Sequence, residues 1–140
     1  MTVWLIDTGP LVAYLDAGDP DHAAVAACLD GFSGRLATTS AVVTEAMHLV
    51  ASDTRGPRLL ADLLAETGAE IYDLSRPPDL HHAVGLMERY ANLPMDFADA
   101  TLLLLAEALG VDDLLTLDRR GFAAFRTRPG RALRLVLDLD

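Results

Sequence analysis

The sequence predicts an α/β protein built on a mostly parallel sheet. Short apolar runs, typical of strands buried on both faces, alternate with longer segments that carry helix-capping signals. Val3-Trp4-Leu5-Ile6 is such a run, and it leads directly into Asp7 and a helix start. The order recurs where the run at 114–117 is followed by Asp118. Because ligands of parallel α/β sheets bind beyond the carboxyl ends of the strands, both carboxylates occupy positions typical of a site.

Length and composition are typical of one globular domain. A chain of 140 residues, 51% of them hydrophobic, can build one proper core, so residues 1–140 are expected to form a single domain. No apolar run approaches the length of a membrane span and no basic segment precedes the first strand, so neither a membrane helix nor a signal peptide is expected. The lone Cys28 excludes an intramolecular disulfide and suits the reducing cytoplasm, which is the predicted location.

Capping and breaking residues divide the first half of the chain. After the strand at 3–6, Pro10 fits the first turn of a helix that Thr8 or Gly9 can cap and that continues to residue 15. The other elements expected here are a helix at 21–30, a strand at 35–38, a helix at 41–52 with Ser40 as its N-cap, a helix at 56–66 and a strand at 69–74.

The second half begins with Pro77-Pro78, which opens a helix that runs to residue 90. Pro94 breaks the pattern, and the strongest helical periodicity follows at 96–109, closed by Gly110. Strands are expected at 114–117 and 133–139. The sheet should therefore have four to five strands, mostly parallel because helices separate most of them.

Glu45 is the most anomalous acid. It lies in the segment 41–50, which is apolar on nearly every predicted helix face and should therefore be buried. A buried ionised Glu is costly unless it is paired or binds a metal. The alternative is that Glu45 shares a narrow solvent-exposed stripe with His48.

Three Asp residues have both a functional and a structural interpretation. Asp96 and Asp99 share a helix face, but Asp96 is also a good N-cap and Asp99 gains from the helix dipole. Asp118 follows a buried strand, as Asp7 does, and its alternative is a polar turn. Co-location favours a site, because separate α/β units would each bring an acid to one edge of the sheet. These four acids are Asp7, Glu45, Asp99 and Asp118.

The net charge and the kind of basic residue exclude several classes of protein. A formal net charge of −10 argues against a general polyanion binder, whereas clustered carboxylates suit a divalent cation. All 11 basic residues are Arg, which excludes P-loop, Schiff-base and phospho-Asp receiver chemistry, since each needs a Lys. Arg119 and Arg120 directly follow Asp118 and are predicted to bind substrate phosphate. For the four later Arg residues, the alternative is charge balance with nearby acids.

Four segments of the chain resemble the signature segments of PIN-domain ribonucleases, in particular the VapC-type toxins of bacterial toxin–antitoxin pairs. They are Ile6-Asp7-Thr8-Gly9-Pro10-Leu11, Thr44-Glu45, Met95-Asp96-Phe97-Ala98-Asp99-Ala100 and Leu115-Thr116-Leu117-Asp118. The resemblance implies a PIN-like three-layer α/β/α sandwich with helices on both sides of the sheet. It also implies a site built by Asp7, Glu45, Asp99 and Asp118, with Asp96 as an additional acid and with Thr8 and Thr116 as supporting hydroxyls. Whether Asp96 or Asp99 ligates more directly stays open.

The chemistry that these residues favour is phosphodiester hydrolysis with one or two Mg²⁺ or Mn²⁺ ions. Oxygen-only ligands select such hard ions, and Mg²⁺ keeps several waters, one of which can be the nucleophile. We expect Asp7 and Asp99 to be direct ligands, and Glu45 and Asp118 to act through water or on a second ion. Thr8 and Thr116 would hold waters or phosphate oxygens.

The predicted function is that of a metal-dependent endoribonuclease acting on single-stranded RNA, as the toxin of a toxin–antitoxin pair. Two other classes stay open: a PIN-like domain that binds RNA or protein with weak catalysis, and a metal-dependent phosphohydrolase of small substrates. The expected partners are RNA, an antitoxin that brings a basic group into the acid crevice, and a second copy of the chain. This homodimer would use apolar surface at 59–64 and its neighbours.

Overall fold

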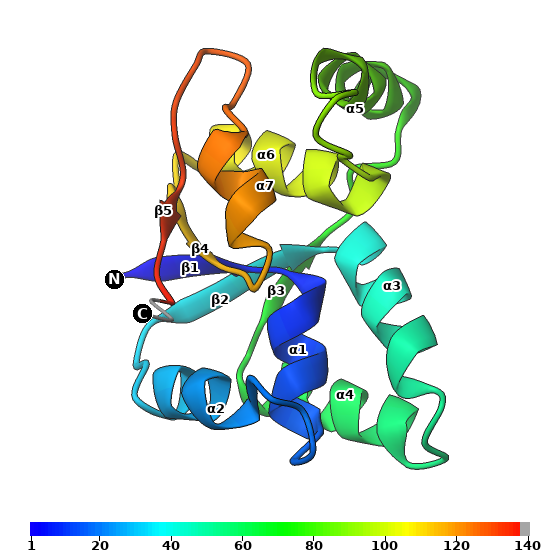
Figure 1. Cartoon of the computed structure of the whole chain (residues 1–140), viewed down its shortest axis with the longest axis vertical. Helices are drawn as coiled ribbons and strands as arrows, with labels where there is room; N and C mark the ends of the chain where they lie inside the picture. The colour runs from blue at the N-terminus through cyan, green and yellow to red at the C-terminus, as the bar shows by residue number, and fades with distance from the viewer. Residues whose placement is uncertain (138–140) are drawn as a thin grey trace.

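A five-stranded sheet forms the centre of the computed structural model, which describes residues 1–137 (Figure 1). Its strands are β1 (Val3–Ile6), β2 (Arg35–Thr39), β3 (Glu70–Tyr72), β4 (Asp113–Leu115) and β5 (Arg134–Leu135). The order across the sheet is β3-β2-β1-β4-β5, and all four neighbouring pairs are parallel. The predicted α/β class with a parallel sheet is therefore confirmed, and β1, which carries Asp7 at its end, is the central strand.

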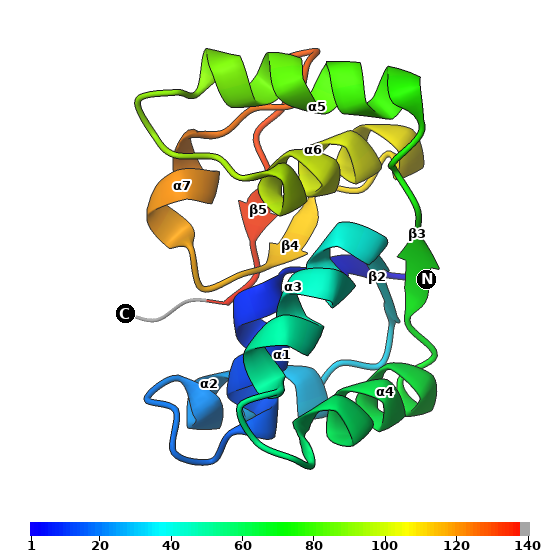
Figure 2. The same cartoon turned by 90° about the vertical axis from the view of Figure 1, so that its right-hand side faces the viewer.

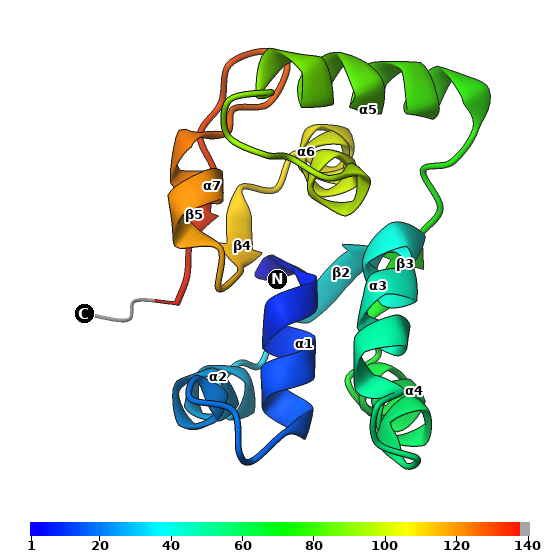
Figure 3. The same ribbon diagram turned by 45° about the vertical axis from the view of Figure 1, so that its right-hand side comes forward.

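Helices cover the sheet on both sides. They are α1 (Thr8–Leu15), α2 (His22–Asp30), α3 (Ser40–Val50), α4 (Gly56–Glu66), α5 (Pro77–Arg89), α6 (Phe97–Leu109) and α7 (Arg119–Ala124). Helices α1, α2 and α4 lie on one side, and α5 and α6 on the other (Figures 1 and 3). Helix α3 contacts α1, α4 and α6, so it bridges the two helical layers near the carboxyl ends of the strands. None of the helices within residues 1–137 is both long and apolar enough to cross a membrane.

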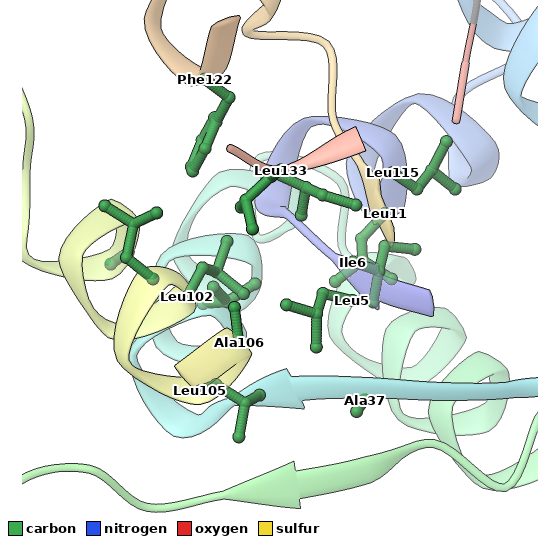
Figure 4. Close-up of a cluster of buried hydrophobic side chains, with 14 of the residues drawn as sticks. Leu5, Ile6, Leu11, Ala37, Leu102, Leu105, Ala106, Leu115, Phe122 and Leu133 are labelled. Atoms are coloured by element: carbon green, nitrogen blue, oxygen red, sulfur yellow. The ribbon is translucent and has the colours of Figure 1, made fainter. Parts of the chain in front are cut away.

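The core extends over both sides of the sheet, and its densest part lies along α6 (Figure 4). Leu5 and Leu102 are fully buried there, and Leu105 is 1% exposed. Helix α6 can be apolar on nearly all sides, since the sheet covers one side and α5 covers the side that faces away from the sheet (Figures 2 and 3). Burial of these large side chains makes α6 a rigid support for the acids at its N-terminus.

The boundaries of several elements differ from the predicted ones. The N-cap of α1 is Asp7 itself, not Thr8 or Gly9, and the N-cap of α3 is Thr39, not Ser40. In both cases a side-chain oxygen at or directly after the end of the strand accepts a backbone N–H, so the helix begins at the next residue. The expected strand at 69–74 is shorter because β3 is an edge strand that pairs only with β2.

Two other differences lie near the C-terminal part of the chain. Strand β4 ends at Leu115 rather than Leu117, because the chain turns there into α7, which was not predicted from the sequence. A helix of six residues carries too little periodicity to be recognised. The strand expected at 133–139 is Arg134–Leu135 within the described residues, and residues 138 and 139 lie outside them.

Helix α3 is not buried on all sides, as its composition predicted. Only Val42, Ala46 and Val50 are buried, whereas Leu49 is 49% exposed. The helix packs with one face on its neighbours and leaves the other to solvent, because it lies at the periphery of the layer. Glu45 is consequently half-buried, on the border between the two faces.

The apolar segment 59–64 is mostly directed inward, contrary to the predicted dimer surface. Leu60 is fully buried and Leu64 is 8% exposed, because α4 is amphipathic and packs on α1 and α3. Large exposed apolar side chains lie elsewhere among the described residues, and they include Leu49, Ile71, Leu80 and Val84.

Candidate active site

Asp7 is the buried centre of the site. It is 7% exposed and follows β1 directly, with its backbone N–H donating to the Leu115 carbonyl at 3.0 Å. Oδ1 accepts the Thr8 N–H and Oδ2 accepts the Thr116 hydroxyl, both at 2.8 Å. Burial raises the pKa of Asp7, and the two hydrogen bonds oppose that effect. The carboxylate is therefore held in one orientation by Thr8 at the start of α1 and by Thr116, which follows β4.

Asp96 and Asp99 cap α6 and lie in the same site. Asp96 Oδ1 accepts the Asp99 N–H at 2.8 Å, and Asp99 Oδ2 accepts the Asp96 N–H at 3.2 Å, which completes a capping box. Burial, followed by the charges of Asp96 and Asp7, raises the pKa of Asp99 to about 8. Asp96 and Asp99 can therefore cap the helix and belong to the site at once, because the capping box uses only one oxygen of each carboxylate.

Asp118 is the N-cap of α7. Its Oδ1 accepts the Gly121 N–H at 3.1 Å, and its own N–H donates to Thr116 Oγ1 at 3.0 Å. A Cβ on Gly121 would lie 2.6 Å from Asp118 Oδ2, so a larger residue at this position would displace the carboxylate from the helix start. The charge of Asp118 adds to the raised pKa of Asp7 and of Asp99, so it lies near both.

Glu45 reaches the same place from α3. Burial raises its pKa first, and the charges of Asp96 and Asp7 raise it further. Interaction with the Thr8 side chain lowers it, yet Thr8 Oγ1 is buried and has no hydrogen bond of normal geometry within residues 1–137. Buried hydroxyls nearly always have a partner, so this oxygen is available to a ligand.

The site brings together all five acids singled out in the sequence, and Thr116 contacts Asp7 rather than solvent. Within residues 1–137, however, no three His, Cys, Asp or Glu side chains lie close enough together to form a ready-made metal cage. Mg²⁺ keeps several of its waters and is commonly held by one or two carboxylates. The oxygen-only donors and the unpartnered Thr8 hydroxyl therefore fit an ion of this kind.

One pair of supporting residues was not recognised in the sequence. Thr39 Oγ1 lies 2.8 Å from Thr101 Oγ1, which donates to the Ala98 carbonyl at 2.7 Å. Both threonines are almost fully buried, and the contact fastens the start of α3 to the first turn of α6. Its only local signal was the run of hydroxyl residues at the end of β2, because the partners are 62 positions apart.

The six arginines that follow Leu117 fall into three groups. Arg128, Arg131 and Arg134 form ion pairs with Glu107, Asp112 and Asp113 at 2.8, 2.6 and 2.7 Å. Arg126 donates to the carbonyls of Ala123 and Phe125. The charge-balance alternative thus holds for three of the last four arginines. Arg119 and Arg120 lie at the start of α7, next to Asp118.

Comparison with known proteins assigns the class. The family model of the PIN domain matches residues 4–127. The chain therefore belongs to the PIN-domain family, and the resemblance noted in the sequence is confirmed. Within the family it is similar to "Ribonuclease VapC26" of Mycobacterium tuberculosis (strain ATCC 25618 / H37Rv), with 36% identity over 134 residues, 94% of this chain and 98% of that protein.

Two solved structures share the fold at lower sequence identity. The crystal structure of Mycobacterium tuberculosis VapC20, described as a sarcin-ricin loop cleaving toxin, has a TM-score of 0.77 at 18% identity and covers 88% of this chain and 95% of that one. A chain of a toxin–antitoxin complex from Klebsiella pneumoniae has a TM-score of 0.65 at 20% identity, covering 87% and 92%. The three-layer PIN-like architecture predicted from the sequence is confirmed.

Replacement of Thr116 by Val tests the support of Asp7. The variant removes the donor to Asp7 and the acceptor for the Asp118 N–H, so we expect the free energy of unfolding to fall by about 1–3 kcal/mol. Urea unfolding at neutral pH measures the change. Thr116→Ser keeps both hydrogen bonds and should retain most of the stability. Equal stability of Thr116→Val and the native protein would show that these contacts do not hold the site.

Proposed function

We propose that the chain is a divalent-metal-dependent endoribonuclease and the toxin of a toxin–antitoxin pair. The observation that carries the proposal is the convergence of acids from β1, α3, α6 and the β4–α7 turn on the carboxyl edge of the sheet, around the nearly buried Asp7. Similarity to a VapC ribonuclease over 94% of the chain supports it.

Mg²⁺ or Mn²⁺ bound there would activate the attacking water and neutralise charge on the phosphate and the leaving oxygen. Asp7 and Asp99 are the proposed direct ligands. Asp7 is fixed by the Thr8 N–H and the Thr116 hydroxyl, so its free lone pairs keep one direction. Asp99 is fixed by the capping box, which leaves its Oδ1 for the ion.

The remaining acids would act on the bound ion indirectly. Glu45 and Asp118 are proposed to hold waters or a second ion, and Asp96 to add charge at the solvent-exposed rim. Burial and the charges of Asp96 and Asp7 raise the pKa of Glu45, which makes it a stronger base and the proposed acceptor of a proton from the attacking water. Thr8 Oγ1 is proposed to donate to a bound water or a phosphate oxygen, because it is buried and has no hydrogen bond of normal geometry within the described residues.

Substrate phosphate would be bound by Arg119 and Arg120. They begin α7 directly after Asp118, so a phosphate between α7 and the acids can contact both a guanidinium and the ion. Single-stranded RNA is the proposed substrate, since a splayed strand can place one phosphodiester in this crevice. We place this reaction in the cytoplasm and in one domain that spans residues 1–140.

A nuclease assay tests the proposal. The purified chain is incubated with short single-stranded RNA in Mn²⁺ or Mg²⁺, and then with EDTA. We expect internal cleavage that stops in EDTA and resumes when the ion is restored. RNA left intact, with phosphate released from nucleotides instead, would indicate a small-substrate phosphohydrolase. RNA binding without cleavage would indicate a binding domain.

Glu45→Gln separates a catalytic from a structural role of this residue. The substitution keeps the size of the side chain and removes a group whose raised pKa shows that its charge is costly. We expect RNA cleavage to fall about 10- to 100-fold, with an unchanged or higher melting temperature at pH 7. A variant that unfolds, yet has native activity per folded molecule, would make Glu45 structural.

The proposed partners are an antitoxin and a second copy of the chain. An antitoxin segment over the crevice would bring a basic side chain to acids whose mutual repulsion raises their pKa values. A symmetric homodimer would cover exposed apolar side chains such as Leu80 and Val84 on α5. Light scattering at tens of micromolar should give the mass of two chains, and the mass of one chain would contradict the dimer.

A further inference from the structure

A cleft of about 520 Å³ opens beside the acids, between α3, the start of α6 and the segment that follows β3. Glu45 and Asp96 are among the residues that line it, so it is continuous with the candidate active site. Small molecules and single groups of larger ligands bind in pockets of roughly 300–1,000 Å³. The cleft is therefore large enough for one nucleoside.

The lining is apolar with a few hydroxyls. Two of the residues that line the cleft, Ala98 and Thr101, are small and buried, so they leave room beside the N-terminal part of α6. Phe97 and Leu74, both half-buried, contribute larger apolar surfaces, and Phe97 is the aromatic residue among those that line the cleft. An aromatic surface next to an open apolar space is typical of sites where single-stranded RNA stacks a base.

The hydroxyl groups that line the cleft already donate their protons in hydrogen bonds within the protein. Ser40 and Ser75 both donate to Asp73 Oδ1, and Thr44 donates to the Ser40 carbonyl at 2.9 Å. A hydroxyl has one proton and two lone pairs, so each of these oxygens can only accept a further hydrogen bond. The cleft thus presents acceptors and nearby carboxylates, which suit a neutral group that donates hydrogen bonds and disfavour a phosphate.

Orientation decides which part of the RNA reaches the cleft. Helix α7, with Arg119 and Arg120, lies on the opposite side of the carboxyl edge from α3 (Figures 1 and 3). If an RNA strand binds with one phosphate between α7 and the acids, the nucleoside next to that phosphate would point toward the cleft. We propose that the cleft between α3 and α6 binds the base next to the scissile phosphate, stacked on Phe97, and selects bases that carry an exocyclic amino group through Ser40 and Ser75.

This inference rests on the proposed ribonuclease function and names a specificity site for it. Binding is measured in the Asp7→Asn background, to prevent cleavage, by fluorescence anisotropy with single-stranded RNA in which one position at a time is abasic. We expect one position where loss of the base weakens binding on the order of 5- to 150-fold. At that position cytosine should bind about 2- to 10-fold more tightly than uracil, which has no amino group.

Variants assign these effects to the cleft. Phe97→Ala should abolish the abasic penalty, and Phe97→Tyr should retain it. Ser75→Ala should remove the preference for cytosine over uracil. Phe32 stacks on Trp4 with ring centroids 3.8 Å apart, beside a separate cavity, so Phe32→Ala and Ser33→Ala are the matched controls, and both should leave the two effects unchanged.

The outcomes separate the two proposals. If the native protein cleaves RNA but Phe97→Ala keeps the full abasic penalty, the cleft assignment is wrong and the nuclease function stands. If Phe97→Ala instead abolishes binding of an arginine-containing peptide, or dimerisation, without changing base dependence, the cleft belongs to a protein partner and the inference is overturned. If the native protein neither binds nor cleaves RNA, both proposals fail.

Discussion

Asp7→Asn should abolish metal-dependent RNA cleavage while leaving the protein folded. The side chain is nearly buried, follows the central strand and has both oxygens oriented by hydrogen bonds. Asn keeps the size and can still accept the Thr8 N–H, since Asn is as good an N-cap as Asp. It removes the negative charge that a divalent ion needs. We expect the rate to fall by about 10²- to 10³-fold or more.

The measurement is cleavage of a fluorescent RNA at saturating Mg²⁺, with circular dichroism and thermal melting as tests of folding. Asp62→Asn is the matched control, because Asp62 is an exposed acid on α4 and the substitution makes the same change in charge. The control should keep native activity. Native turnover by Asp7→Asn would remove Asp7 from the site, whatever the family resemblance implies.

Divalent ions should raise the melting temperature near neutral pH and have little effect near pH 4. The folded-state pKa of Asp99 is about 8, against an ordinary value of 3.8, so ionising Asp99 costs the native state more than the unfolded state. The stability contributed by protonated Asp99 is fully present below the ordinary pKa and is lost as pH rises to about 8. The pKa values of Asp7 and Glu45 are raised as well, so they act in the same direction.

Bound Mg²⁺ or Mn²⁺ reverses this loss, because the ion favours the ionised carboxylates and binds only the native site. At millimolar Mn²⁺ and pH 7–8 we expect an increase in melting temperature of roughly 3–10 °C. Asp99→Asn should lose most of this increase and should flatten the metal-free decline between about pH 5 and 8, whereas Asp62→Asn should retain both. A melting temperature indifferent to Mn²⁺ at neutral pH would show that the acids do not form one ion site.

Local sequence signals were sufficient for most of the fold. Apolar runs located four of the strands to within a few residues, and Gly110, with φ 65°, ends α6 as predicted. The signals failed where an element was very short, as in α7, or where composition suggested burial that packing did not provide, as in α3. Apolar composition alone does not tell how many faces of a helix find a neighbour.

Asp7 and Asp118 could be singled out as candidates because a carboxylate after a buried strand is conspicuous in the sequence. The sequence presented capping as the alternative to a site for Asp96, and a polar turn as the alternative for Asp118, but both residues cap helices at the candidate site. The two roles coincide because the helix start that needs a cap lies at the carboxyl edge of the sheet, where ligands bind.

Tertiary structure alone decided how the acids are held and what lies beside them. Thr116 and Asp7 are 109 positions apart, and Thr39 and Thr101 are 62 apart, so no periodicity or spacing links them. The cleft beside Glu45 needs α3, α6 and the segment after β3 at one place. The sequence by itself determined which residues could carry charge, cap a helix or fill a core, because those properties belong to single side chains and their near neighbours. Which oxygens face one another depended on how the helices pack across the sheet, because hydrogen bonds and clefts exist only between surfaces that folding brings together.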